Sequence, residues 1–120
     1  MSRTFVGILI AMMISAAPAA AHVVVKSSSI EQGGAYGAAL GNPVPENLEI
    51  VFNGDVGLAE LRLETVAGEP VKLDFVKPKV FQASFIVPLP TLTAGAYVFL
   101  WRAVAKDGHA MSGKIEFSVE

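Results

Sequence analysis

Hydrophobic and polar residues alternate with a period of two along much of the chain after residue 22, which is the pattern of half-buried β-strands. No stretch after that point shows the 3.6-residue spacing of an amphipathic helix. One segment is apolar on both faces and therefore predicts a central strand; it spans residues 96–105. The other predicted strands are residues 23–25, 48–52, 61–64, 71–75, 80–87 and 115–119.

Residues that favour turns separate these predicted strands, which argues for tight connections. The turn signals are Gly33-Gly34, Asn42-Pro43, Asn53-Gly54-Asp55, residues 67–70 and Asp107-Gly108. About seven short strands in about 100 residues predict an all-β fold, a small antiparallel Greek-key sandwich or barrel of the immunoglobulin-like kind.

A tyrosine at the start of the most hydrophobic strand sharpens this prediction. Tyr97 follows the corner sequence Leu92-Thr93-Ala94-Gly95-Ala96, as in the tyrosine corner of immunoglobulin-like domains, where the hydroxyl bonds to backbone a few residues upstream. Tyr97, Phe99 and Trp101 share one face of this strand and are expected in the core.

The first 21 residues have the three parts of a cleaved secretory signal peptide. Arg3 gives a cationic start, an apolar run spans residues 5–14, and Ala19 and Ala21 occupy the A-x-A positions. The run is shorter than the roughly 20 residues that span a bilayer. Cleavage before His22 leaves one domain, residues 22–120, whereas an earlier cut would leave a stub on His22.

The composition of the predicted mature domain excludes several classes of site. Loss of Arg3 takes the net charge from −2 to −3, so nucleic acid is disfavoured as a partner, as is direct membrane insertion after leader cleavage. The chain has no cysteine, so a thiolate metal site is impossible. Met111 is its only thioether, because the other three methionines lie in the leader.

The remaining chemistry centres on two histidines, His22 and His109. No G-x-S-x-G turn exposes a serine nucleophile, and no glycine-rich loop opens a helix for phosphate. An Asp-Gly dipeptide favours a hairpin on conformational grounds alone, so Asp107-Gly108-His109 is by itself a weak signal. A first strand and a final hairpin that meet at one end would give one amine, two imidazoles and a carboxylate, a set that suits Cu(II).

The C-terminal third carries a resemblance to a known family. In order and approximate spacing it contains Ala94-Gly95-Ala96-Tyr97, Trp101-Arg102, Asp107-Gly108-His109, Gly113 and Phe117-Ser118-Val119. With a mature N-terminal histidine, this pattern resembles the CopC family of periplasmic copper-binding proteins.

The resemblance implies one Cu(II) per chain, bound by the amine and imidazole of His22 together with Asp107 and His109. It also implies a periplasmic copper carrier without enzymatic turnover, acting in copper resistance or in copper uptake and homeostasis. The partner would be a CopD-like inner-membrane copper permease or a copper-resistance oxidase.

Departures from the family pattern limit what else it implies. The mature chain has only Met111, so no methionine-rich Cu(I) site is expected, and Asp55 is no more than a candidate carboxylate beside the ligands. Two alternatives remain: a metal-free immunoglobulin-like interaction module, and a copper monooxygenase with a terminal histidine brace. The second is disfavoured because Asp107 would fill a coordination position that oxygen needs.

Overall fold

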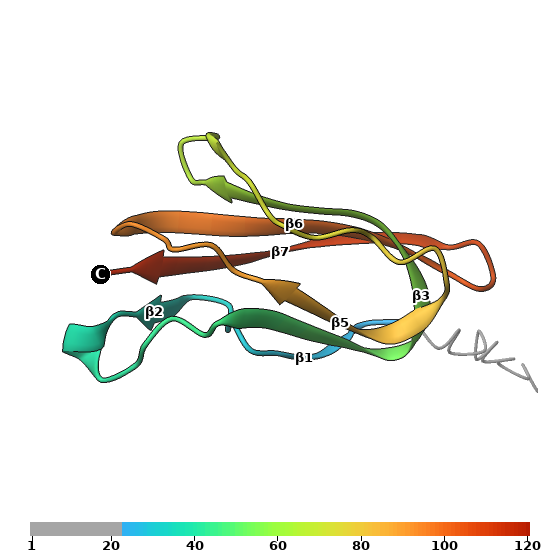
Figure 1. Cartoon of the computed structure of the whole chain (residues 1–120). Helices are drawn as coiled ribbons and strands as arrows, with labels where there is room; N and C mark the ends of the chain where they lie inside the picture. The colour runs from blue at the N-terminus through green and yellow to red at the C-terminus, as the bar shows by residue number, and fades with distance from the viewer. Residues whose placement is uncertain (1–22) are drawn as a thin grey trace, which may run out of the picture.

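The computed structural model describes residues 23–120, so the predicted leader and His22 lie outside the described residues. The all-β prediction is confirmed: the described part holds seven strands and one short 3₁₀ helix, η1 (Ala38–Leu40). None of its helices is long and apolar enough to cross a membrane. The strands are β1 (Val25–Ser28), β2 (Gly34–Tyr36), β3 (Asn47–Thr65), β4 (Pro70–Val71), β5 (Gln82–Pro88), β6 (Gly95–Ala105) and β7 (Ala110–Val119) (Figure 1).

Strand β3 joins the two layers of the fold. Its first half pairs with β1 and β5, and its second half pairs with β4 and β6. The pairing register with β5 shifts between Val51 and Val56, and that with β6 shifts between Leu58 and Glu60. Bulges bend and twist a strand, so one continuous strand can pass from one layer to the other. The layers then face each other across the core (Figure 1).

This long strand corrects the prediction that residues 48–52 and 61–64 are separate strands. Asn53-Gly54-Asp55 is a bend within β3 and not a turn between two strands. The sequence alone does not separate the two cases, because glycine occurs in β-bulges as well as in turns. We call residues 53–55 the β3 bend.

Other predictions also differ from the structure. Strand β2 is absent from the predicted set, since three residues are too few to show alternation, and it pairs with β7 in parallel. In the predicted strand 71–75, only Val71 is paired. Leu73 and Phe75 still pack against the core, so the alternation there reports burial of one face without a strand partner.

The core lies between the layers and is apolar, with no buried polar or charged residue in the described part. Phe52 of β3 packs edge-on against Phe85 of β5, and Phe99 of β6 stacks on Phe117 of β7. The inward aromatics expected on β6 are present: Tyr97 and Phe99 are buried, and Trp101 packs edge-on against Phe52 at 5.2 Å between ring centroids.

The predicted tyrosine corner is confirmed. The Tyr97 hydroxyl donates to the Thr93 carbonyl oxygen at 2.6 Å, and its side chain is buried. The hydroxyl therefore ties the corner before β6 to the strand itself.

Replacing Tyr97 with phenylalanine is expected to lower the free energy of unfolding by about 1 kcal/mol, because the Thr93 carbonyl loses its partner. At this size the melting temperature would fall by roughly 4–8 °C. Thermal unfolding followed by circular dichroism checks this. Thr93→Val keeps the carbonyl and is expected to cost less; an equal loss in both variants would place the effect in the threonine side chain.

Candidate metal centre

Asp107 and His109 lie in the turn between β6 and β7, as the Asp-Gly signal predicted. The Ala105 N–H donates to the His109 carbonyl at 2.8 Å, and the Gly108 N–H donates to the Ala105 carbonyl at 2.9 Å. Gly108 has φ 91, in the region that favours glycine. A three-residue loop of this kind holds its flanking residues in a defined hairpin register, so the positions of Asp107 and His109 are set by the backbone.

Within the turn, Asp107 contacts His109 through both carboxylate oxygens. Oδ1 accepts the backbone N–H of His109 at 3.0 Å, and Oδ2 lies 2.7 Å from Nδ1 of the ring. Both side chains are exposed, 58% for Asp107 and 75% for His109. The backbone N–H of His109 lowers the pKa of Asp107, and the contact with the ring lowers it further. Asp107 therefore stays ionised at neutral pH.

This contact resembles the carboxylate-histidine pairs in which a carboxylate orients a metal-binding imidazole. Nδ1 of His109 faces Asp107. Nε2 is therefore the ring nitrogen that can bind a metal without breaking this contact. Direct binding by Asp107 would use an oxygen that now contacts His109. The pair thus supplies one nitrogen and one carboxylate, both accessible.

The β3 bend connects this turn to the start of the described chain. On one side, Asn53 pairs with Val24: the Val24 N–H donates to Asn53 Oδ1 at 2.9 Å, and the Asn53 N–H donates to the Val24 carbonyl at 3.0 Å. On the other side, Asp55 Oδ2 lies 3.3 Å from Nζ of Lys106. The start of β1 and the β6–β7 turn therefore lie at the same end of the molecule, away from the C-terminus (Figure 1).

The described residues do not complete a metal site by themselves. Among residues 23–120, no group of three or more histidine, aspartate, glutamate or cysteine side chains could hold a metal ion. His22 lies outside the described residues. Asp55 pairs with Lys106, and Met111 is half-buried against the core.

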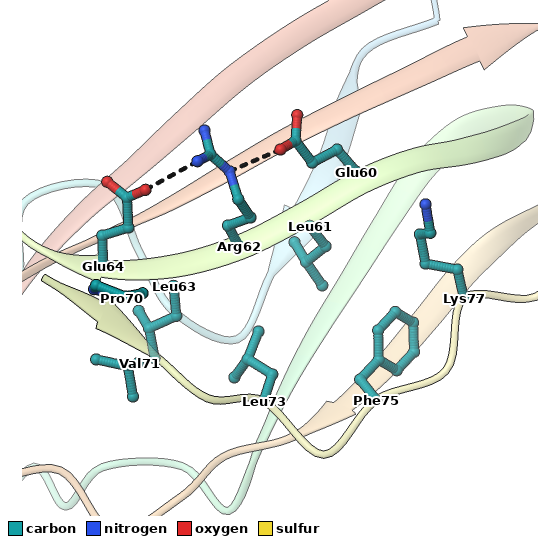
Figure 2. A pocket seen from close by; sticks show the side chains of 10 residues that line it. All are labelled: Glu60, Leu61, Arg62, Leu63, Glu64, Pro70, Val71, Leu73, Phe75 and Lys77. Atoms are coloured by element: carbon teal, nitrogen blue, oxygen red, sulfur yellow. Dashed lines mark hydrogen bonds and ion pairs between the residues drawn. The ribbon is translucent and has the colours of Figure 1, made fainter. Parts of the chain in front are cut away.

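A groove of about 360 Å³ lies away from the β6–β7 turn, between the second half of β3 and residues 70–77. Figure 2 shows Leu61 and Leu63 facing Leu73 and Phe75 across it, while Arg62 on the outer side of β3 bridges two glutamates. Neither Asp107 nor His109 lines this groove, and both side chains are exposed, so a site at the β6–β7 turn would lie on the open surface.

Comparison with known proteins places this chain in a family. The family model described as the CopC domain matches residues 25–120. The chain belongs to the CopC family. It is 34% identical over 128 residues to copper resistance protein C of Pseudomonas syringae pv. tomato, covering 100% of this chain and 98% of that protein.

Two solved structures share the CopC fold. CopC from Methylosinus trichosporium OB3b superimposes with a TM-score of 0.63 at 24% identity, covering 82% of this chain and 94% of that one. PcoC, a methionine-rich copper resistance protein from Escherichia coli, gives 0.58 at 25% identity, covering 82% and 99%. PcoC is described as methionine rich. The present chain has only Met111 after residue 22, so it differs from PcoC in methionine content.

The Asn53 contact with Val24 was missed from the sequence. An Asn-Gly dipeptide predicts a turn, and only the folded chain shows that the side chain of Asn53 bonds to Val24, just before β1. Asp55 could be noticed as a carboxylate, but its pairing with Lys106 depends on β3 running past β6.

Proposed function

We propose that this CopC-family protein binds one Cu(II) in the periplasm and hands it to a partner, without catalysing a reaction. The ligands are the α-amine and imidazole of His22, exposed by cleavage of residues 1–21, with Asp107 and His109. Three nitrogens and a carboxylate suit the tetragonal geometry of Cu(II). The partner is a CopD-like copper permease or a copper-resistance oxidase, and the role is copper resistance or copper supply.

The observation that carries this proposal is the placement of Val24 and the Asp107–His109 pair on either side of the β3 bend. Val24 pairs with Asn53, and Val56 pairs with Ala105, the last residue of β6 before the turn. Asn53 and Val56 are three residue steps apart on β3, at most about 10 Å. His22 precedes Val24 by two residues, and we propose that this position lets its nitrogens reach His109.

The test is a Cu(II) titration with electron paramagnetic resonance on protein that begins at His22. The matched control carries one extra alanine before His22, which keeps the imidazole and removes the amine from that residue. We expect one tight equivalent with a nitrogen-rich tetragonal spectrum, lost or remodelled in the control. Equal weak binding by both proteins would overturn the copper proposal and favour a metal-free interaction module.

A further inference from the structure

We propose that Asn53 is a positioning residue for copper binding, which holds the N-terminal segment beside the Asp107–His109 turn before the metal arrives. This inference rests on the proposed function. It concerns a side chain that does not bind the metal and acts through Val24.

The contact between Asn53 and Val24 has two parts with different origins. The bond from the Asn53 N–H to the Val24 carbonyl is a backbone bond that any residue but proline could make. The bond from the Val24 N–H to Oδ1 needs a side-chain acceptor of this length at position 53. Together they fix both backbone polar groups of Val24, two residues after His22.

The neighbouring residues make this a restrained position. Val23 is half-buried and packs against the core, and its Cγ2 lies 3.6 Å from where a Cβ would stand on Gly54. A side chain larger than alanine at position 54 would compete with Val23 for this space. Val24 itself is 52% exposed, so burial holds it weakly and the Asn53 bonds matter more.

Ordering the segment in the metal-free protein reduces the entropy that copper binding must otherwise overcome. Fixing the backbone of a residue costs conformational entropy, and binding to a preorganised site avoids that cost. Loss of an orienting partner outside the ligand set lowers metal affinity by about 10–100-fold. Asn53 bonds to Val24 and not to a metal ligand itself. We therefore expect a loss of affinity at the lower end of this range, about 10-fold.

The experiment compares Asn53→Ala, Asn53→Asp and Asn42→Ala in protein that begins at His22. Asn42 is the matched control: its Nδ2 donates to the Ala35 carbonyl at 2.9 Å, beside the C-terminal end of the fold. Cu(II) affinity is measured by competition with a chelator, and thermal unfolding and amide exchange at Val24 are measured without metal.

We expect Asn53→Ala to weaken Cu(II) binding about 10-fold and to speed exchange at the Val24 amide, with a melting temperature no lower than that of Asn42→Ala. Asn53→Asp keeps an acceptor at the same place and is expected to restore slow exchange and most of the affinity.

Two results would overturn the inference. Parent affinity in Asn53→Ala would show that the segment needs no such restraint, and an equal loss in Asn42→Ala would show a general effect on stability. If the parent protein itself binds no copper through its N-terminal amine, the proposed function fails and the positioning role fails with it.

Discussion

Replacing His109 with alanine is expected to reduce Cu(II) affinity by more than about 100-fold, beyond the loss typical of residues that only orient a ligand. His109 supplies the only imidazole in the described part of the chain. Its side chain is 75% exposed, so its removal opens no cavity. The backbone N–H that Asp107 accepts is kept in the variant, and the turn should stay intact. A chelator competition assay measures the loss, and electron paramagnetic resonance should show one nitrogen ligand fewer.

The fold supplies a matched control in its other three-residue hairpin. Glu69 follows Gly68 as His109 follows Gly108, and the Thr65 N–H donates to the Glu69 carbonyl at 2.8 Å. Glu69→Ala should leave copper binding unchanged. Asp107→Asn can still accept the His109 N–H but carries no charge, so we expect a smaller loss than in His109→Ala. Full affinity in His109→Ala would remove the β6–β7 turn from the copper site.

Replacing Gly113 with valine is expected to destabilise the fold by about 1–3 kcal/mol, the range for an overpacked core. Gly113 of β7 lies opposite Trp101 of β6, and a Cβ there would stand 2.5 Å from Cζ2 of the indole. The ring cannot stay in place, because it also packs edge-on against Phe52. A loss of 2 kcal/mol corresponds to roughly 8–16 °C in melting temperature for a domain of this size.

The chain has one tryptophan, so intrinsic fluorescence reports this change directly. A displaced indole should emit at longer wavelength as water reaches it. Ser112→Val is the control, because Ser112 is exposed on the opposite face of β7 and surface substitutions usually shift stability by less than about 0.5 kcal/mol. Unchanged emission and melting temperature in Gly113→Val would show that Trp101 does not depend on this glycine.

The sequence predicts the β6–β7 turn of the candidate site but not the contact between Val24 and Asn53, and the reason is physical. The turn at Asp107-Gly108-His109 follows from local conformational preference, since Asp-Gly favours a tight hairpin wherever it falls between two strands. The contact of Val24 with Asn53, by contrast, joins residues that are far apart in sequence. It depends on the register of β3 against both β1 and β6, and local preference does not encode register between distant strands.

The β3 bend shows the same limit. Asn53-Gly54-Asp55 signals an interruption, and the sequence could not distinguish a loop between two strands from a bulge within one. The difference arises from pairing: the two halves of β3 find different partners, β1 and β5 before the bend and β4 and β6 after it. Strand β2 is not predicted from the sequence, because a strand of three residues is defined by its pairing with β7 and not by a pattern of its own.

The sequence by itself determined the all-β class, the inward face of most strands, the tyrosine corner and the β6–β7 turn, because alternation and turn chemistry act between near neighbours. It also determined the family, through residues whose spacing reflects the same turn and strands. Only the tertiary structure decided that one strand joins the two layers, and that Asn53 bonds to Val24 at the same end of the molecule as the β6–β7 turn. Those contacts form between distant residues when the core closes, and burial of the whole apolar face selects them.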